Sequence, residues 1–273
     1  MGATEDVAIV RLRPGDALAA LVLSTEAQWN QNEADWQFFL VHGIVFGAMT
    51  PDAGLVATAA LLPYTEGNAW ISMVLVTASQ RRRGLATRLV DACLDEAARQ
   101  KCTCWLDATP AGAAVYGALG FTPAGTSQRM RFAGAKATPT PLPEGKFDEL
   151  LARDFRAMGF GRGTLLQELH SRPNARIVAQ DGAIALVRDG RTARHIGPLF
   201  AVDAVSAAQC VAAIVESDAG PFLLDANGDQ RDFIDRLISA GWTAERPFQR
   251  MRFGRSNAMG TQPAFAGAGP EYG

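Results

Sequence analysis

The sequence predicts a mixed α/β fold built as two tandem domains, each with a central twisted mixed sheet flanked by helices. Three observations lead to this prediction: an internal repeat, the chain length, and strand patterns on both sides of helical patterns. The 273 residues exceed the usual single domain of roughly 100 to 150 residues. A hydrophobic content of 48% suffices for two packed cores. Strands that alternate with helices favour one central sheet in each domain.

The repeat is the clearest sign of two domains. The pentapeptide QRMRF occurs at 128–132 and again at 249–253. Each copy follows a short apolar strand ending in Leu-Asp-Ala, a helical segment and a glycine before an aromatic residue. The offset between the copies is 118 residues at Asp107 and Asp225 and 121 residues at the pentapeptides, so the second copy has three extra residues in its helical region. We interpret this ordered match as a duplication.

The boundary between the domains is predicted from composition. The segment AGAKATPTPLPEG at 133–145 has prolines at alternate positions and few large apolar residues, which is typical of an extended, stiff connection. We therefore predict an N-terminal domain over 1–134, a proline-rich linker over 135–145 and a C-terminal domain over 146–255. The tail, 256–273, is expected to be irregular or docked on a surface.

Hydrophobic periodicity gives the elements of the first half in order. The helix over 84–100 has the clearest pattern, because Leu85, Leu89, Cys93 and Ala97 recur at four-residue steps. The other predicted segments are a strand at 7–13, helices at 17–29 and 34–46, strands at 54–64, 68–76 and 102–108, a helix at 113–119, and the strand that carries the first pentapeptide.

Charge and cysteine content exclude several classes of protein. The net charge of −2, from 26 basic and 28 acidic side chains, gives no general reason to expect nucleic acid or membrane as a partner. The four cysteines form no zinc-like quartet, so no metal is expected. Residues 1–12 lack the apolar core of a signal peptide, and no apolar run reaches membrane-spanning length. We expect a soluble cytoplasmic protein, for which a homodimer stays open.

The stretch WISMVLVTASQRRRGLATRLV at 70–90 carries the strongest chemical signal. Its apolar strand ends at Val76 and a helix begins near Gly84, so unpaired backbone N–H groups gather at a helix N-terminus, which attracts anions. Gly84 and Ala86 leave room for a phosphate, and Arg81, Arg82 and Arg83 add positive charge. The alternative is an arginine-rich solvated turn before an ordinary helix.

Two motifs here resemble those of the GCN5-related N-acetyltransferase (GNAT) family. Arg81-x-x-Gly84-x-Ala86 after a strand is similar to the family's acetyl-CoA pyrophosphate loop. AAVYGALGF at 113–121 is similar to the helix and strand that follow the cofactor site, with Tyr116 in register. The sequence departs from the family at 110–112, where an asparagine is common. The second half resembles the family more faintly.

The resemblance implies roles for individual residues. Backbone groups of Val74 and Val76 would pair with the amide-bearing arm of acetyl-CoA, and an N–H near Leu75 or Val76 would stabilise the oxyanion. Tyr116, a phenol with an ordinary pKa of about 10, would protonate the departing thiolate, or would only pack its ring on the sheet. The cofactor-binding residues implied in this way are Val74, Leu75, Val76, Arg81, Arg82, Arg83, Gly84, Leu85, Ala86 and Thr87.

The general base and the acceptor pocket are less specific. The strand positions 72–74 hold no carboxylate, which leaves Glu66, Asp35, Glu33 or His42 acting through water, or direct attack by a neutral amine. The acceptor pocket is predicted in AQWNQNEADW at 27–36, where two tryptophans lie beside polar side chains. Its tentative residues are Trp29, Asn30, Asp35 and Trp36, although Trp36 with Phe39 and Leu40 also fits a helical core.

The second half is expected to have lost the chemistry. Its counterpart of the cofactor loop, at 195–216, has no Arg-x-x-Gly-x-Gly pattern, and it contains Pro198 and acidic Asp203. No tyrosine precedes Gly241-Trp242 as Tyr116 precedes Gly120-Phe121. We therefore predict one acetyl-CoA per chain.

The expected function is acetyl transfer from acetyl-CoA to a primary amine of a small molecule or amino acid. The alternatives are acetylation of a protein terminus or lysine, a CoA-binding module that senses a ligand, and a scaffold without cofactor binding.

Overall fold

The structure is a computed structural model that describes residues 7–134, 140–254, 260, 262 and 264–273. The chain divides into two compact units, Met1–Trp105 and Leu106–Gly273, and each is described by itself. Residues 135–139 of the predicted linker and part of the predicted tail lie outside the described residues.

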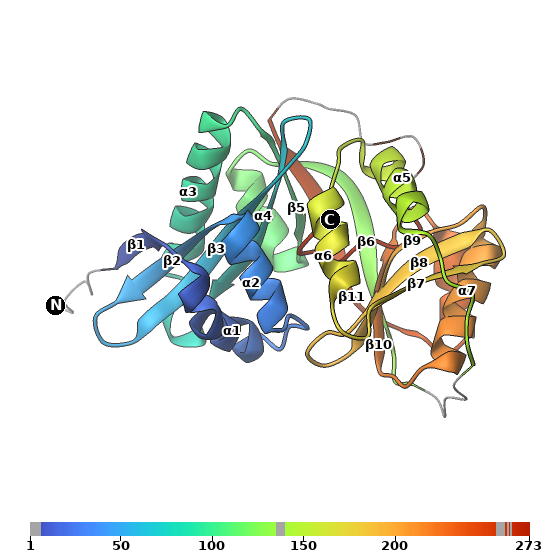
Figure 1. Cartoon of the computed structure of the whole chain (residues 1–273). Helices are drawn as coiled ribbons and strands as arrows, with labels where there is room; N and C mark the ends of the chain where they lie inside the picture. The colour runs from blue at the N-terminus through green and yellow to red at the C-terminus, as the bar shows by residue number, and fades with distance from the viewer. Residues whose placement is uncertain (1–6, 135–139, 255–259, 261, 263) are drawn as a thin grey trace. The chain divides into compact units, whose positions relative to one another are not determined.

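The sheet of the first unit has the strand order β1-β2-β3-β4-β5 (Figure 1). The first four strands pair antiparallel, whereas β5 runs parallel to β4 and pairs with it from Asn68–Thr103 to Trp70–Trp105. The strands are β1 (Ala8–Arg11), β2 (Ile44–Thr50), β3 (Gly54–Tyr64), β4 (Asn68–Val76) and β5 (Thr103–Ala108).

Helices pack against this sheet and bury it. The helices are α1 (Ala17–Glu26), α2 (Glu33–His42) and α3 (Leu85–Arg99), with short 3-10 helices η1 (Pro14–Asp16) and η2 (Ala78–Gln80). All three α-helices contact β3, and the strand is buried without interruption from Val56 to Leu62. Such a continuous apolar strand is typical of a sheet covered on both faces.

One predicted helix was too long. The pattern at 34–46 predicted a single helix, but α2 ends at His42 and β2 begins at Ile44. Gly43 makes the change of direction, with an extended backbone and with Phe39 O only 2.7 Å from where a Cβ would lie. The β-branched Ile44 and Val45 then pair with β3, as their strand propensity favours.

The second unit has the strand order β11-β6-β10-β9-β8-β7. Among the strand pairs of its described residues, only β9 and β10 run parallel; the others are antiparallel. Its elements are α4 (Pro110–Ala118), β6 (Thr122–Phe132), α5 (Phe147–Met158), α6 (Gly163–Ser171), β7 (Arg176–Gln180), β8 (Ala183–Arg188), β9 (Arg194–Phe200), α7 (Ala204–Ser217), β10 (Phe222–Asn227), α8 (Arg231–Ser239) and β11 (Thr243–Phe253).

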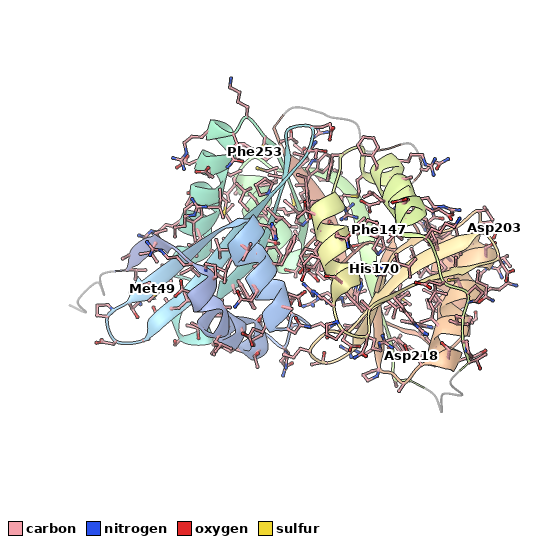
Figure 2. The ribbon with its side chains drawn as sticks, in the orientation of Figure 1. Met49, Phe147, His170, Asp203, Asp218 and Phe253 are labelled. Atoms are coloured by element: carbon pink, nitrogen blue, oxygen red, sulfur yellow. The ribbon has the colours of Figure 1, made fainter. Side chains whose placement is uncertain are left out.

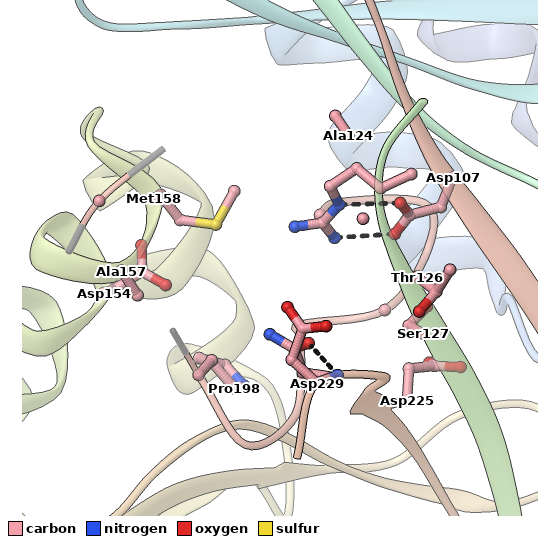
Figure 3. Close-up of a pocket in the computed structure, with 18 of the residues that line it drawn as sticks. Asp107, Ala124, Thr126, Ser127, Asp154, Ala157, Met158, Pro198, Asp225 and Asp229 are labelled. Carbon is pink, nitrogen blue, oxygen red and sulfur yellow. Dashed lines mark hydrogen bonds and ion pairs between the residues drawn. The ribbon is translucent and has the colours of Figure 1, made fainter. Parts of the chain in front are cut away.

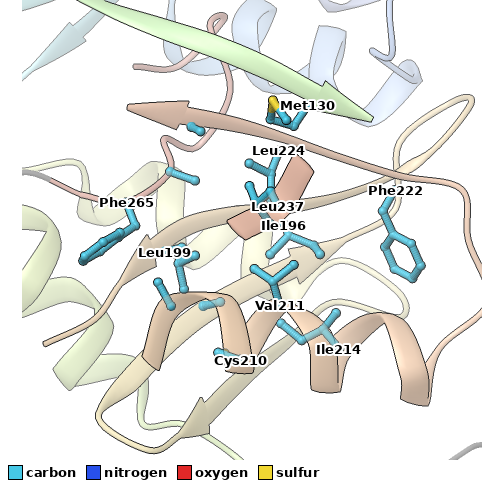
Figure 4. Close-up of a cluster of buried hydrophobic side chains, with 14 of the residues drawn as sticks. Met130, Ile196, Leu199, Cys210, Val211, Ile214, Phe222, Leu224, Leu237 and Phe265 are labelled. Carbon is cyan, nitrogen blue, oxygen red and sulfur yellow. The ribbon is translucent and has the colours of Figure 1, made fainter. Parts of the chain in front are cut away.

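The core of the second unit lies between its sheet and α7. Ile196 and Leu224 from the strands form a cluster with Val211 and Ile214 from the helix, and Phe265 of the C-terminal segment joins them (Figure 4). The helices α5 and α6 pack against β8. Where α5 begins and α6 ends, the rings of Phe147 and His170 stack with centroids 5.7 Å apart (Figure 2).

The two copies of QRMRF exchange partners. The strand β6, which carries the first copy, pairs with β10 and β11 of the second half. Arg129 binds Asp225 through two bonds of 2.8 and 2.9 Å, and the equivalent Arg250 binds Asp107 through two bonds of 2.9 and 2.8 Å. Each arginine therefore holds the Leu-Asp-Ala aspartate of the other copy, a reciprocity that supports duplication of one ancestral unit.

This exchange also explains where the compact units divide. The predicted boundary at 135–145 follows the repeat in the sequence and stays a prediction. The two compact units of the structure divide after Trp105 instead. The reason is that β6 pairs with β10 and β11, so it belongs with the second half of the chain.

Within the described part of the chain, no helix is both long and apolar enough to span a bilayer. The same residues contain no group of three or more His, Cys, Asp or Glu side chains that could hold a metal ion. The four cysteines are free thiols.

Candidate functional site: the turn between β4 and α3

The strand β4 is bulged near its C-terminal end. Ala60 of β3 faces Ser72, whereas Thr58 already faces Leu75, so β4 has an extra residue. Met73 takes a left-handed conformation with φ of 52°, and the hydroxyl of Thr58 donates a 2.8 Å hydrogen bond to Met73 O. A bulge bends a strand and re-aims its backbone groups. The ladder between β4 and β5 ends at Trp70, so Val74 and Val76 lie beyond it.

The turn after β4 leads into an uncapped helix. Arg82 and Gly84 both have left-handed backbones, with φ of 62° and 74°. Gly84 is the N-cap of α3 and provides no side-chain cap. A 3.1 Å bond joins Arg88 N–H to Gly84 O, which leaves the N–H groups of Leu85, Ala86 and Thr87 as the helix's first-turn donors. Left-handed residues within a turn help to form anion-binding concavities of backbone N–H groups.

The charge of this turn is positive and faces solvent. Arg81, Arg82 and Arg83 are exposed, and the first turn of α3 has no acidic residue. Arg81 also folds back, since its Nε donates to Val76 O at 3.1 Å. A Cβ placed on Gly84 would meet nothing within 4 Å, so there is open space in front of the turn. These residues fit a phosphate-bearing ligand.

A residue that sequence reasoning missed fixes the turn in place. Glu26, at the end of α1, accepts a 2.7 Å bond from Ala78 N–H and a 2.7 Å bond from the Thr77 hydroxyl. The Thr77 bond is the main reason that the pKa of Glu26 is lowered, followed by the Ala78 bond. The partners are more than fifty residues apart in sequence, and no local pattern indicates the contact.

Two predicted acceptor residues support the helix pair instead. Trp36 is fully buried, and its Nε1 donates to Ser24 at 3.0 Å. Asp35 is 4% exposed and forms a capping box with Asn32, through bonds of 2.8 and 3.1 Å. These contacts favour the core alternative for Trp36 and give Asp35 a capping role, and the part of either residue in an acceptor pocket stays a prediction.

The other predicted acceptor residues, Trp29 and Asn30, are half-buried in the turn between α1 and α2. In the same turn, Gln31 Oε1 is buried without a hydrogen-bond partner among the described residues, as is Ser72 Oγ on β4. Gln31 and Ser72 are only 4% and 8% exposed. A buried polar group normally has a partner, so these two atoms identify places where a polar ligand could bind.

The candidate bases are dispersed. Glu66 lies in the hairpin before β4, with φ of 53°, and so is at the opposite end of β4 from the bulge. The His42 ring packs against Phe38 at a tilt of 36°, with centroids 4.8 Å apart, and Glu33 lies in the first turn of α2. Asp35 has a capping role, and direct attack by a neutral amine stays a prediction.

Tyr116 lies on α4, in the second unit. Its ring packs edge-on against Phe121, with centroids 5.8 Å apart, and Gly112 makes room for it, because a Cβ there would lie 3.1 Å from the ring. The helix begins at Pro110, where the sequence departs from the family, and Thr109 caps it through a 3.3 Å bond from Gly112 N–H. The catalytic role of Tyr116 stays a prediction.

In the second copy of the strand–turn–helix, a side chain of the protein itself caps the helix N-terminus. Asp203 is the N-cap of α7, and its Oδ1 accepts a 2.8 Å bond from Ser206 N–H. This bond to the backbone of Ser206 is the main reason that the pKa of Asp203 is lowered. A carboxylate thus occupies the place where an anion would bind.

The second unit also contains a cavity of about 290 Å³ (Figure 3). Three of its aspartates are paired: Asp107 with Arg250, Asp225 with Arg129 and Asp154 with Arg162. Glycines of the C-terminal segment form part of the opposite wall.

Comparisons with known proteins identify the family of the chain. A model described as the acetyltransferase (GNAT) family matches residues 18–121, and one described as an acetyltransferase (GNAT) domain matches residues 150–264. The chain is 25% identical over 247 residues to YitH of Bacillus subtilis, an uncharacterized N-acetyltransferase; the match covers 86% of this chain and 87% of YitH.

Solved structures share the fold. A Pyrococcus horikoshii protein with a proposed acetyltransferase assignment matches with a TM-score of 0.82 at 18% identity, over 100% of this chain and 98% of that one. A GCN5-related N-acetyltransferase from Sphaerobacter thermophilus matches with a TM-score of 0.62 at 14% identity, over 94% and 98% of the two chains. The two family matches lie on either side of the proline-rich segment and account for the repeat. The chain belongs to the GNAT acetyltransferase family and has two GNAT domains in tandem.

Proposed function

We propose that this chain transfers the acetyl group of acetyl-CoA to a primary amine of a small molecule or amino acid, and that the N-terminal half does so alone. The observation that carries the proposal is the turn between β4 and α3. It combines an uncapped helix N-terminus, two left-handed residues and three exposed arginines, a combination suited to a pyrophosphate.

Each part of the turn has a role in this proposal. When bound, acetyl-CoA supplies a thioester whose carbonyl carbon accepts the amine. The N–H groups from Arg81 to Thr87 hold the pyrophosphate, and Glu26 keeps the turn in place through Thr77 and Ala78. The bulge at Met73 frees backbone groups of Val74 and Val76 for the amide-bearing arm. An N–H of Leu75 or Val76 stabilises the oxyanion.

The proton balance needs one acid from the chain. A neutral amine forms the new N–C bond and later releases its proton to solvent. As the C–S bond breaks, the thiolate takes a proton from Tyr116. This assignment rests on the match of Tyr116 to the family's tyrosine.

The acceptor would be recognised by polar groups of the first unit. Gln31 Oε1 and Ser72 Oγ are buried and without partners among the described residues. A hydroxyl or ammonium group of an acceptor would satisfy either oxygen. Trp29 and Asn30, in the same turn as Gln31, remain the proposed flanking contacts.

Calorimetry with acetyl-CoA and the full chain tests the proposal. We expect one site per chain, because only the first copy has an uncapped cationic turn.

A thermal-shift screen of amines and amino acids in the presence of acetyl-CoA then selects acceptors, since a ligand that binds the native state raises stability. Thiol release with a selected amine should follow. A stoichiometry of two would refute the single site, and thiol release only with peptides would redirect the proposal to protein acetylation.

A further inference from the structure

The parallel strands β9 and β10 separate after a short shared ladder. Within the described residues, their ladder consists of the pairs Arg194–Phe222 and His195–Leu223. Further along, Leu199 on β9 and Ala226 on β10 each form a bridge to the same residue, Ala266 of the C-terminal segment. We call the space between the diverging strands the β9/β10 slot, and the segment 264–273 the tail.

Backbone hydrogen bonds join the tail to both strands. On the β9 side, Leu199 N–H donates to Ala266 O and Phe265 N–H donates to Leu199 O, both at 2.9 Å. On the β10 side, Asn227 N–H donates to Phe265 O at 2.9 Å and Gly267 N–H donates to Asp225 O at 3.0 Å. The tail thus replaces the ladder that the two strands no longer form with each other. It behaves as an added strand, a recurring mode of peptide recognition.

The slot selects small residues at its centre. Ala266 is fully buried, so a larger side chain would need space that is not present there. Gly197 on β9 lies so close that a Cβ on it would be 2.0 Å from Gly267 O. Beside the slot, Phe265 enters the core of the unit and meets the ring of Phe233 edge-on, with centroids 5.5 Å apart (Figure 4).

Two buried arginines hold the rest of the tail. Arg188 donates to Ala268 O at 2.8 Å and to Glu271 at 3.2 Å, and its guanidinium lies 5.7 Å from the centre of the Tyr272 ring. Arg162 donates to Tyr272 O at 2.9 Å and also binds Asp154. Both arginines are less than 5% exposed. The tail has no helix or strand, which agrees with the irregular alternative of the prediction, but it is integrated into the unit and is not docked on its surface.

We propose that the β9/β10 slot is a binding site for an extended peptide with small central side chains, and that the tail is a ligand that fills it within the same chain. Its recognition elements are the backbone groups of Leu199, Asp225 and Asn227, together with the anchoring arginines. The site is separate from the cofactor turn. It also gives the second half a physical reason, besides Asp203, to bind no acetyl-CoA.

The test uses the full chain with a protease site inserted after Arg255. After cleavage, the tail should stay with the body on gel filtration, and the amides of Leu199 and Asn227 should keep their slow hydrogen exchange. A labelled synthetic peptide of sequence 261–273 should then exchange into the slot. Loss of the tail at once, with unchanged exchange at these two amides, would overturn the proposal.

Peptide variants provide a matched control. Ala266→Glu places a carboxylate in the dry centre of the slot and should weaken competition at least about ten-fold, whereas Gln262→Glu makes the same charge change at an exposed residue and should compete like the parent. Equal competition by the two variants would contradict the proposal. If the protease does not cut the inserted site, a chain that ends at Gly260 replaces the cleaved protein. In that chain the amides of Leu199 and Asn227 should exchange hydrogen faster, and addition of the parent peptide should slow their exchange again.

Acetyl-CoA separates this proposal from the proposed enzymatic function. Saturating acetyl-CoA should leave the labelled peptide bound, because the two ligands have different sites. Displacement of the peptide by acetyl-CoA would contradict the inference even if acetyl transfer were found.

Discussion

The two strand–turn–helix segments of this chain began as copies, and they now differ in how their polar groups are satisfied. In the first copy, α3 begins at Gly84 without a side-chain cap. In the second, Asp203 caps α7 through Ser206 N–H. The space beside the strand before each turn differs as well. In the second copy, the tail forms β-bridges to both β9 and β10. In the first copy, no described residue forms such a bridge to β4.

This difference teaches how a duplicated binding site becomes a structural domain. A helix N-terminus and a pair of diverging strands each present unpaired backbone groups, and such groups are costly when buried without partners. A ligand can satisfy them, or the chain can. The second copy uses its own carboxylate and its own tail, which stabilises that half at all times but leaves little for a cofactor to bind.

Transplanting the second copy's cap into the first should strongly weaken cofactor binding. Gly84→Asp places a carboxylate at the N-cap of α3, where Asp203 lies on α7. We expect acetyl-CoA to bind at least about 100-fold more weakly, a loss of about 2.7 kcal/mol, because the carboxylate repels the phosphates and competes for the same N–H groups. Calorimetry measures the change.

Gly84→Ala is the control for this variant, because Gly84 has φ of 74° and any side chain there is strained by roughly 1–2 kcal/mol. Alanine has the strain without the charge, and it should retain most of the affinity. If a folded Gly84→Asp protein binds acetyl-CoA as the wild type does, the pyrophosphate lies elsewhere.

Tyr116→Phe tests the second asymmetry, a tyrosine that only the first copy has. The substitution keeps the ring and its contact with Phe121 and removes the proton donor. Turnover should fall on the order of 10² to 10⁴-fold, the usual contribution of a positioned acid, while the affinity for acetyl-CoA changes little. Thiol release measured with any accepted amine is sufficient. Wild-type turnover in the folded variant would leave protonation of the thiolate to solvent.

The sequence predicted well those features that depend on neighbouring residues, such as the bounds of helices and strands. The bounds of β3 and β4 agree with the prediction, and α3 differs by one residue at each end, because apolar runs and a four-residue period are properties of neighbouring residues. The cationic turn was also found in this way, since its glycine and arginines are adjacent in sequence.

The missed features all depend on partners far apart in the chain. Glu26 holds Ala78 N–H, and a backbone donor has no side-chain signature. The tail was expected to be irregular or docked on a surface, because glycine and alanine give no burial signal. Those small residues are what the gap between β9 and β10 admits. The partner exchange of Arg129 and Arg250 was likewise invisible, since the repeat gives their equivalence but not which aspartate each one meets.

That exchange allows a matched pair of stability measurements. In the Arg129–Asp225 pair the side chains are 6% and 4% exposed, and in the Arg250–Asp107 pair they are 18% and 3% exposed. Arg129→Met should therefore lower the free energy of unfolding by about 3–5 kcal/mol, because it leaves a buried carboxylate without its arginine. Arg250→Met should cost about 1–2 kcal/mol, since the Arg250 side chain is 18% exposed and water can replace part of its contact with Asp107. Urea unfolding compares the two, and equal losses would mean that burial does not distinguish the copies.

A pH-dependent effect on stability is expected through His195. By register, Trp70 faces Trp105 and His195 faces Leu223, so His195 occupies the position of Trp70 in the repeat. Burial, and then the charge of Arg188, lower its pKa to about 4, against the opposing effects of Asp225. Its Nε2 lies 3.1 Å from Asp225, and its Nδ1 lies 2.6 Å from Arg188.

The sign of the effect follows from proton uptake. Between pH 6.5 and about 4, the unfolded chain holds a proton on this histidine and the folded chain does not, so acidification favours unfolding. The free energy of unfolding should fall by up to about 3 kcal/mol across that range through this group.

Other groups titrate in the same range, so the informative quantity is the difference between wild type and His195→Gln, which keeps a donor and an acceptor but does not titrate. Urea midpoints measured from pH 7 to pH 4 should fall more steeply for the wild type. Parallel curves would mean that His195 takes up its proton in the folded state, and that the second copy accommodates charge at this position better than its burial implies.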